Sequence, residues 1–287
     1  MKILIFGATG LIGLPILTAL AKSTYEVECV YRNSSFDDYF ARLGIKVYKV
    51  TNIEDRFINS LLCCGKYDFV INCLGITKHN KLGSDLSELL YWNIDFPRLL
   101  DNLSQKIGFN LIHISTDCVF DGKDGNYSES YYPNATDAYG ITKGIADIVL
   151  KNAMILRTST IGDHPTDTSG LFNWFKYQKS CSGFYNAIFS GMINTYFAEK
   201  IIIEDILSKN YFSKGVYHIA AEPINKYALL HLLNSKFEYD ITIHKDGSLN
   251  VNRSLNAEKY YKLSGRKPVK WNVMMHEFKK GSKYYDW

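Results

Sequence analysis

Residues 2–13 have the sequence KILIFGATGLIG. The apolar run 2–6 is typical of a buried parallel strand, and three glycines spaced three residues apart follow it directly. In a dinucleotide-binding loop the first glycine allows a tight turn, the second lets the backbone approach a pyrophosphate, and the third lets the next helix pack against the strand. The N-terminus of that helix then faces the phosphates. We therefore expect a nucleotide cofactor on the loop residues Gly7, Thr9, Gly10, Leu11, Ile12 and Gly13.

Further strand-like runs recur along the chain with helical intervals between them, at 26–31, 46–50, 69–73, 111–115, 154–158 and 216–220. This alternation predicts an α/β protein with a Rossmann-type, doubly wound parallel sheet. Helices are also expected at 196–207 and 269–280. We divide the chain into a cofactor-binding domain, residues 1–162 plus about 201–221, and a smaller interwoven substrate-binding lobe, about 163–200 plus 222–287.

The composition limits the class of protein. The 287 residues carry a formal charge of +4 that is spread along the chain, which gives no basic run for nucleic acid. No apolar run approaches the ~20 residues needed to span a membrane, and no signal peptide precedes the first strand. The six cysteines form no Cys-x-x-Cys pair, so buried free thiols and a cytoplasmic location are expected. The seven histidines show no metal-ligand spacing, and we predict no metal site.

The stretch 139–143 contains a tyrosine and a lysine four residues apart, Tyr139 and Lys143. One helical turn separates them, so both side chains lie on one helix face. A fixed cation beside a phenol favours the phenolate and lowers its pKa, which suits a proton relay to a sugar oxygen or an alcohol. By itself this spacing also fits chance, because the chain holds 21 tyrosines.

A third motif follows the apolar run 109–115, namely Ser115-Thr116-Asp117-Cys118-Val119-Phe120-Asp121-Gly122. Together with the glycine loop and Tyr139-Gly140-Ile141-Thr142-Lys143, it resembles the extended short-chain dehydrogenase/reductases, and specifically the dTDP-4-dehydrorhamnose reductase group. The hallmark of that group is Ser-Thr-Asp-Tyr-Val-Phe-Asp-Gly, from which only Cys118 departs. The resemblance extends over residues 1 to about 162.

The resemblance implies hydride transfer from a nicotinamide to a carbonyl carbon. Tyr139 would give a proton to the carbonyl oxygen, Thr116 would hydrogen-bond that oxygen, and Lys143 would hold the nicotinamide ribose. Ser115 would face the cofactor, because ligands bind beyond the carboxyl ends of the strands in such a sheet. Asp117 would either contact substrate or cap the following turn.

Residues after the second and third expected strands bear on the choice of cofactor. Arg32, helped by Asn33, stands where an arginine accommodates a 2'-phosphate, so NADP(H) is preferred and NAD(H) remains possible; the alternative is an arginine that faces solvent. Asn52 and Ile53 either contact adenine or form an ordinary turn.

The resemblance also assigns residues near the nicotinamide ribose. These are the small-residue segment Cys73, Leu74 and Gly75, which follows Asn72, and the helix residue Asn93. An asparagine inside a helix competes with the backbone for hydrogen bonds, so Asn93 needs a specific role, and the family gives it the active-site backbone or a relay water.

Expected substrate contacts lie in the second lobe. The segment 183–191 contains Asn186 and Ser190, which either bond the sugar nucleotide or belong to a plain loop. Arg253 resembles the family's late arginine, which pairs with the nucleotide diphosphate. Thr160 replaces the aromatic residue usual after Arg-Thr-Ser, which points to a different hexose. Known members of the group carry a structural magnesium at a dimer contact, but no matching acidic ligands are recognised in this sequence, and a homodimer is possible.

The sequence therefore predicts an NADPH-dependent reductase of a nucleotide-linked 4-keto-6-deoxyhexose for surface glycans, with either dTDP-4-dehydrorhamnose or a UDP-linked 2-acetamido sugar as substrate. One alternative is an epimerase or dehydratase on the same scaffold. Dehydratases of this superfamily need an Asp-Glu pair after the threonine, which Asp117-Cys118 does not supply. The other alternative is a non-catalytic cofactor-binding subunit, such as the regulatory subunit of methionine adenosyltransferase.

Overall fold

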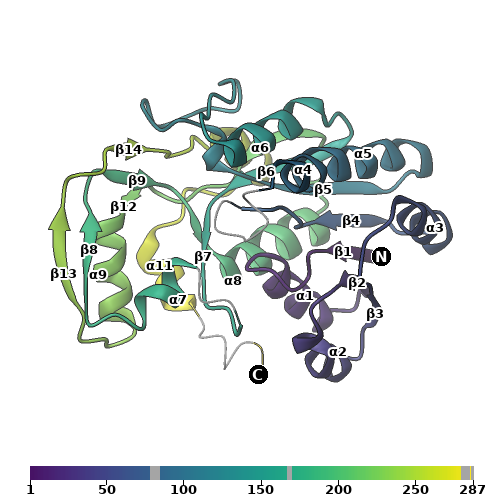
Figure 1. The fold of residues 1–287 in the computed structure, drawn as a ribbon, viewed down its shortest axis with the longest axis horizontal. Helices are drawn as coiled ribbons and strands as arrows, with labels where there is room; N and C mark the ends of the chain where they lie inside the picture. Colours follow the sequence, from purple (N-terminus) through teal and green to yellow (C-terminus); the bar gives the residue numbers. More distant parts are fainter. Residues whose placement is uncertain (78–84, 167–169, 279–284, 286–287) are drawn as a thin grey trace.

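The computed structural model describes residues 1–77, 85–166, 170–278 and 285. A seven-stranded sheet, in the order β11-β6-β5-β4-β1-β2-β3, forms the larger part of the molecule (Figure 1). All its described strand pairs are parallel. The strands are β1 (Lys2–Phe6), β2 (Glu26–Tyr31), β3 (Lys46–Lys49), β4 (Phe69–Asn72), β5 (Asn110–Thr116), β6 (Ala153–Thr158) and β11 (Gly215–His218). The doubly wound α/β fold predicted from the sequence is confirmed.

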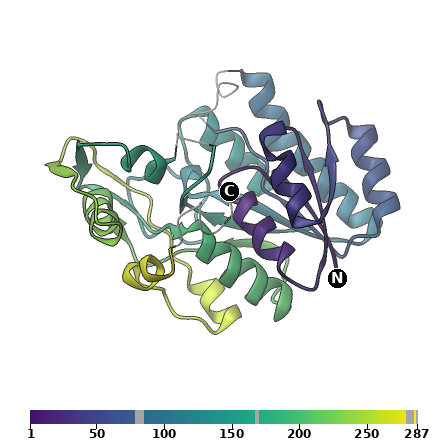
Figure 2. The same ribbon diagram turned by 90° about the horizontal axis from the view of Figure 1, so that it is seen from below.

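Helices cover both faces of this sheet because its strands are apolar on both sides (Figures 1 and 2). One face packs with α1, α2 and the segment α8–η5, and the other with α3, α4, η3 and α5. The bounds are α1 (Gly13–Ala21), η1 (Ser34–Phe36), α2 (Asp37–Leu43), α3 (Asp55–Gly65), α4 (Leu86–Leu90), η3 (Tyr91–Asp95), α5 (Phe96–Ile107), η4 (Asp117–Val119), α6 (Ala138–Val149), α8 (Asn194–Tyr196) and η5 (Phe197–Ser208).

Most of the remaining elements form a smaller lobe beside the carboxyl ends of the sheet strands (Figure 1), whereas α10 packs against β11. Short sheets pair β10 with β7, β9 with β12 and β14, and β13 with β8. The elements are β7 (Thr160–Ile161), α7 (Leu171–Phe175), β8 (Ser180–Phe184), β9 (Ala187–Phe189), β10 (Met192–Ile193), β12 (Ile224–Asn225), α9 (Lys226–Lys236), β13 (Thr242–Asp246), β14 (Val251–Asn252), α10 (Glu258–Ser264) and α11 (Trp271–Glu277).

The element bounds differ slightly from those expected. The third, fourth and last sheet strands end one or two residues early, β5 and β6 each begin one residue early, and β5 also extends to Thr116. The helix expected at 196–207 is present as α8 and η5, which span 194–208. That expected at 269–280 is α11, over 271–277, and residues 279 and 280 lie outside the described residues. The return of the chain into the main sheet at β11 agrees with the proposed division, which stays a prediction.

The structure also bears on two expectations drawn from composition, which concern the cysteines and membrane-spanning segments. All six cysteines are free thiols, but only Cys29 is buried, and Cys63 and Cys64 are exposed on α3, so the expectation of buried thiols was wrong for most of them. None of the helices in the described ranges is long and apolar enough to cross a membrane.

Candidate active site

The glycine loop between β1 and α1 has the conformation that its sequence predicts. Gly7 has φ +78°, and a Cβ there would lie 2.8 Å from the carbonyl carbon of Cys73. A Cβ on Gly13 would lie 2.1 Å from the carbonyl oxygen of Gly7, so only glycine lets α1 begin this close to β1. A Cβ on Gly10 would meet only ordinary contacts, so the protein itself leaves open the side that a pyrophosphate would approach.

Side chains from the second half of the chain hold this loop. Asn194 donates its Nδ2 hydrogen to the carbonyl oxygen of Leu11 at 2.9 Å, and His164 Nε2 lies 2.9 Å from the carbonyl oxygen of Thr9. Both contacts join residues more than 150 positions apart. The loop is therefore fixed by packing between the sheet and the segments that follow β6.

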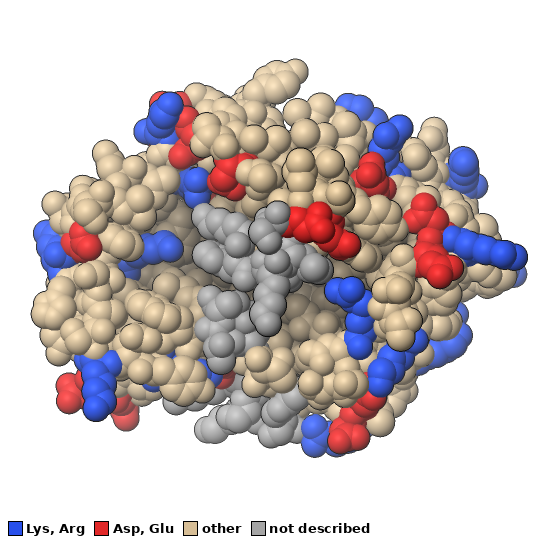
Figure 3. All heavy atoms as spheres, in the orientation of Figure 1, with Lys and Arg blue, Asp and Glu red and all other residues tan. Residues whose placement is uncertain are grey.

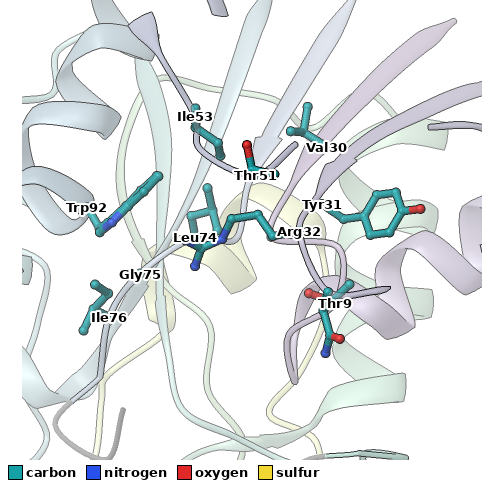
Figure 4. A pocket seen from close by; sticks show the side chains of 12 residues that line it. Thr9, Val30, Tyr31, Arg32, Thr51, Ile53, Leu74, Gly75, Ile76 and Trp92 are labelled. Carbon is teal, nitrogen blue, oxygen red and sulfur yellow. The ribbon is translucent and has the colours of Figure 1, made fainter. Parts of the chain in front are cut away.

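A cavity of about 430 Å³ lies at the carboxyl ends of β1, β2 and β4 (Figure 4). The Arg32 side chain extends across it from the end of β2, with its guanidinium carbon 5.8 Å from the ring centre of Trp92. Thr51 and Ile53 line the cavity, whereas Asn52 between them does not. The lining residues are Gly7, Thr9, Val30, Tyr31, Arg32, Asn33, Thr51, Ile53, Leu74, Gly75, Ile76 and Trp92.

Asn93 joins this cavity to α6. It lies in the π-helical segment η3, is fully buried, accepts a hydrogen bond from the Ile76 amide, and donates to the Ile76 carbonyl and to the Thr142 hydroxyl. A Cβ placed on Gly75 would lie 3.8 Å from Lys143 Nζ. The Lys143 amine therefore lies close to Gly75, which lines the cavity, and Asn93 joins the loop after Gly75 to α6.

Tyr139 and Lys143 lie one turn apart on α6, as expected, but their polar atoms have different partners. Lys143 Nζ donates to the Ile114 carbonyl at 2.8 Å and lies 3.2 Å from His113 Nε2. Burial lowers the pKa of Lys143 to about 8, although the charges of Asp147 and Cys73 oppose this.

The pKa of Tyr139 contradicts the prediction. It is raised because burial disfavours the phenolate and the charge of Cys118 adds to this effect, while a hydrogen bond with Thr116 lowers it. The Lys143 nitrogen is turned to the end of β5, so it does not produce the expected depression in this arrangement. Thr116 lies beside Tyr139, as expected, and its hydroxyl also accepts a hydrogen bond from the Cys118 amide.

Asp117 follows Thr116 directly, accepts a hydrogen bond from the Thr116 hydroxyl and is 5% exposed. Burial raises the pKa of its carboxyl group to about 6, against the opposing charge of Arg253. The oxygen that caps the turn η4 is the hydroxyl of Thr116, which leaves Asp117 to line a second cavity. Ser115, expected near the cofactor, is buried at the end of β5 and is not among the residues that line either of these cavities.

The second cavity, of about 340 Å³, lies between the β5 and β6 ends and the smaller lobe. Arg253 projects toward it, although its Nε donates to the Phe120 carbonyl at 2.9 Å and its Nη1 lies 3.8 Å from Cys118 Sγ. A second cation, Lys226, lines it from the start of α9. The full lining is Asp117, Cys118, Ser159, Thr160, Ile161, Leu171, Ala187, Ile188, Phe189, Lys226, Leu249, Val251 and Arg253.

Two expected substrate residues lie elsewhere. Ser190 is 2% exposed, and its hydroxyl accepts a hydrogen bond from the Leu255 amide at 2.8 Å, which makes it a link between backbone segments. Asn186 lies in the turn between β8 and β9, outside the residues that line the cavity. The segment 183–191 instead contributes Ala187, Ile188 and Phe189 of β9 to the lining of the cavity, and the assignments of Asn186 and Ser190 stay predictions.

Sequence reasoning also missed residues. Lys226 carries no motif, and only its position as the first residue of a helix capped by Asn225 could have drawn attention to it. Trp92 precedes Asn93 directly, so the helix that contains the asparagine offered a signal for it. His113 was treated as one of seven scattered histidines, although it lies two residues before the Ser-Thr-Asp motif.

Charged side chains on the face shown in Figure 3 are interspersed, with no single basic patch there. Among the residues that the structure describes, no group of three or more His, Cys, Asp or Glu side chains is arranged to hold a metal ion. Hydroxyl, carboxyl, amine and guanidinium groups lie in and near the two cavities.

A doubly wound sheet with this glycine loop and this threonine, tyrosine and lysine defines an extended short-chain dehydrogenase/reductase. Residues 1–170 match the family model described as the RmlD substrate binding domain, and the chain belongs to that family, which consists of sugar-nucleotide reductases. The resemblance found in the sequence is confirmed.

Curated relatives match only part of the chain. The methionine adenosyltransferase 2 subunit beta of Bos taurus is 27% identical over 147 residues, which cover 50% of this chain and 40% of that protein. The dTDP-4-keto-6-deoxy-D-glucose reductase of Streptomyces niveus is 26% identical over 162 residues, which cover 54% and 51%. The chain thus spans about half the length of the curated relatives it matches.

Solved structures match the whole fold. A dTDP-4-dehydrorhamnose reductase from Clostridium acetobutylicum has a TM-score of 0.78 at 21% identity, covering 97% of this chain and 98% of that one. The Bacillus anthracis dTDP-4-dehydrorhamnose reductase in complex with NADP has 0.75 at 18%, covering 96% and 98%. The Bordetella bronchiseptica enzyme WbmG in complex with NAD and UDP has 0.76 at 15%, covering 99% and 93%. At these identities the likeness establishes the fold alone.

Proposed function

We propose that this protein is an NADPH-dependent reductase of a nucleotide-linked 4-keto-6-deoxyhexose. One observation carries the proposal: Thr116, Tyr139 and Lys143 lie close to residues that line two cavities. Lys143 Nζ lies near Gly75, which lines the first cavity, and Tyr139 and Thr116 lie beside Asp117 and Cys118, which line the second. Such a pair of cavities suits a reaction that brings a cofactor and a substrate together.

The first cavity fits a dinucleotide. Gly10 leaves space at the start of α1 for a pyrophosphate, and Arg32 supplies an exposed guanidinium where a 2'-phosphate would lie. The bound nicotinamide would supply the hydride. NADP(H) is preferred on the strength of Arg32, and NAD(H) remains an allowed cofactor. Lys143 would hydrogen-bond the nicotinamide ribose from its place near Gly75.

The substrate carbonyl would lie against Thr116 and Tyr139. The Thr116 hydroxyl orients the carbonyl oxygen, and the Tyr139 phenol donates its proton there as the carbon accepts hydride. A raised pKa keeps Tyr139 protonated at neutral pH, which suits a proton donor. The bound cofactor and ribose would bring Lys143 into the relay that restores this proton.

The second cavity fits the nucleotide-linked part of the substrate. Arg253 and Lys226 supply two cations for a diphosphate, while Ile188, Phe189 and Leu249 offer apolar surface. Thr160 lines the same cavity, at the position where rhamnose reductases usually carry an aromatic residue. Because threonine is smaller than an aromatic side chain, it leaves room for a hexose larger than rhamnose, such as a UDP-linked 2-acetamido sugar. The dTDP-linked sugar is the other candidate substrate.

The test is to incubate the purified protein with NADPH and a panel of dTDP- and UDP-4-keto-6-deoxyhexoses, following absorbance loss and identifying the product by NMR. Oxidation of NADPH with formation of a 4-hydroxy sugar supports the proposal. A product that is epimerised or dehydrated without net NADPH consumption would assign the scaffold to the alternative chemistry.

The substrate cavity has its own test. Arg253→Ala should weaken binding of UDP or dTDP by roughly one to two orders of magnitude, because a charge-assisted contact contributes about 1.5–3 kcal/mol. Affinity for NADPH should not change. Lys209→Ala is the matched control, since Lys209 is a cation paired with Glu204 on η5, away from both cavities. Equal nucleotide affinity in wild type and Arg253→Ala, measured by calorimetry, would remove Arg253 from the substrate site.

A second candidate is a non-catalytic cofactor-binding subunit, which the match to methionine adenosyltransferase 2 subunit beta favours. It predicts NADPH binding without turnover on any member of the panel. The presence of Thr116, Tyr139 and Lys143 supports the enzyme over this candidate.

A homodimer and a role in surface glycans remain part of the proposal. Four apolar side chains lie exposed on one side of α6: Ile141, Ile145, Ile148 and Val149. Such a stripe suits helix packing with a second copy. Sedimentation velocity on wild type and Ile145→Lys decides it, because a dimer that uses this surface should dissociate in the variant.

A further inference from the structure

A buried histidine lies behind Lys143. His113 is on β5, is fully buried, and stands directly opposite Asn72 of β4 in the parallel register. Its Nε2 is 3.2 Å from Lys143 Nζ and its Nδ1 is 3.1 Å from Asn72 Nδ2. The imidazole thus connects the lysine to the backbone of the cofactor loop, and the mechanism proposed above assigns it no role.

The Leu74 amide fixes the direction of the hydrogen bonds in the series from Asn72 through His113 to Lys143. Asn72 Oδ1 accepts a hydrogen bond from the Leu74 amide at 3.1 Å, so it is the Asn72 NH2 group that faces His113. Burial holds the pKa of His113 well below its usual range, so the ring is neutral and carries one N–H and one acceptor nitrogen. Nδ1 accepts from Asn72, and the hydrogen is therefore on Nε2.

That hydrogen points at the Lys143 nitrogen. An ammonium group has three donors and no acceptor, so it would meet the Nε2–H of His113 donor to donor. A neutral amine has a lone pair that accepts this hydrogen while one of its own hydrogens still goes to the Ile114 carbonyl. In the series of hydrogen bonds that runs from the Leu74 amide through Asn72 and His113 to Lys143, every group has a partner only when Lys143 is an amine.

We propose that His113 is a positioning residue for Lys143, which holds the nitrogen close to the cofactor cavity and presents an N–H to it so that the amine form competes with the ammonium near neutral pH. The role of Lys143 in a proton relay rests on the proposed function. The hydrogen-bond arrangement of Asn72, His113 and Lys143 does not. A lysine that readily exchanges its proton suits a relay that must restore the proton given up by Tyr139.

Other groups around Lys143 act on the same equilibrium. Asp147, one turn further along α6, and Cys73, after β4, both favour the ammonium, whereas burial favours the amine. The Asp147 carboxylate is itself paired with Arg157 of β6 at 2.6 Å, which limits its effect. Two groups of β5 contact the Lys143 nitrogen, namely the His113 side chain and the Ile114 carbonyl.

The first measurement uses the wild-type protein without ligand. Long-range 1H–15N NMR of 15N-histidine-labelled protein distinguishes the two neutral tautomers by their nitrogen shifts, and the His113 signals are assigned from a variant that lacks them. The proposal requires the Nε2–H tautomer. An Nδ1–H tautomer, with a bare Nε2 toward Lys143, would overturn it.

The second measurement follows the Lys143 Cε resonance with pH in 13C-lysine-labelled protein, assigned by its loss in Lys143→Arg. Wild type should titrate near the pKa of about 8, and His113→Met, which removes the facing N–H, should raise the pKa of Lys143. His113→Gln can accept from Asn72 and still present an N–H, so it should stay near the wild-type value.

His218→Met is the matched control. His218 is also fully buried on the same sheet, where its Nε2 lies 3.3 Å from Arg157 Nη1, but it does not contact Lys143. Loss of this histidine should lower the melting temperature without moving the titration of Lys143. If His113→Met titrated as wild type does, or if His113→Gln rose with it, the residue would have a packing role only.

These measurements need no substrate. If none of the sugar nucleotides is reduced, the proposed function fails while the tautomer and the titration still decide the role of His113. If His113→Met does not fold, the tautomer in wild type decides it alone.

Discussion

Gly140→Ala should disturb the helix that carries both proposed catalytic side chains. A Cβ at Gly140 would lie 2.3 Å from the carbonyl oxygen of Cys118 and 2.5 Å from the Cβ of Ala135. Contacts below 3.0 Å are not tolerated, so α6 and the backbone after β5 would have to separate by at least about 0.7 Å. Tyr139 immediately precedes this position, so its phenol would move relative to Thr116.

The sign of the effect on stability follows from two opposing magnitudes. Alanine favours a helix over glycine by about 0.8–1 kcal/mol, and overpacking against rigid backbone costs about 1–3 kcal/mol or more. Because the obstructing atom is a backbone oxygen, the cost falls at the upper end, and a net loss of roughly 1–2 kcal/mol is expected. At about 2–4 °C per kcal/mol, the melting temperature should fall by roughly 2–8 °C.

Calorimetry and the NADPH oxidation assay together test this reasoning. A displacement approaching 1 Å can cost about a hundredfold in rate, so turnover should fall by roughly ten- to a hundredfold. Lys209→Ala is again the control, because its side chain is at the end of η5, away from both cavities and from the exposed stripe of α6. A Gly140→Ala protein that melts with or above wild type would show that α6 does not pack on Cys118 as closely as the structure has it.

Three further changes have definite expected outcomes. Tyr139→Phe should retain NADPH binding but lose at least about two orders of magnitude in turnover, since it removes only the proton donor; a near-normal rate would end its assignment. Arg32→Ala should raise the KM for NADPH much more than that for NADH, and equal effects would argue against a 2'-phosphate contact. Burial would raise the pKa of Glu28, but hydrogen bonds from Tyr67 and Lys2 lower it to about 2. Its stabilisation, up to about 3 kcal/mol, is present above pH ~4.5 and is lost toward pH 2, so melting temperatures of wild type and Glu28→Gln should converge over that range.

Motifs defined by local geometry were predicted well from the sequence. The spacing of Gly7 and Gly13 predicts two local features, a positive φ at the first glycine and a close approach of the helix to the strand at the last. The structure has both. Arg32 could be placed because a strand end fixes where the next residue points. The four-residue spacing of Tyr139 and Lys143 likewise needs only a helix to place both on one face.

Properties that depend on long-range packing were not predictable in this way. The pKa of Tyr139 depends on how much water the finished fold excludes, and the neighbour expected to lower it, Lys143, is drawn away by the Ile114 carbonyl. Ser190 has the chemistry of a substrate ligand, yet the chain brings the Leu255 amide to its hydroxyl. Lys226 enters the site only because α9 begins beside Arg253, which no local pattern encodes.

The polar side chains behind the site form a buried layer of two groups across the sheet. Asn72 and His113 are paired in register on β4 and β5, and Arg157 and His218 are paired on β6 and β11. From α6 above them, Lys143 contacts the first pair and Asp147 forms an ion pair with Arg157.

Such a layer is costly to bury, and removing one partner of a buried ion pair leaves an uncompensated charge. The layer therefore stabilises one arrangement of α6 on the sheet, because any shift of the helix would break contacts to several strands together. It also reaches the second lobe, since His218 Nδ1 lies 3.0 Å from the Tyr127 carbonyl and 3.1 Å from that of Asn256, three residues after Arg253. Lys143, near the first cavity, and Arg253, which lines the second, are thus held by one framework of strands, which keeps the side chains of the proposed site in a fixed arrangement.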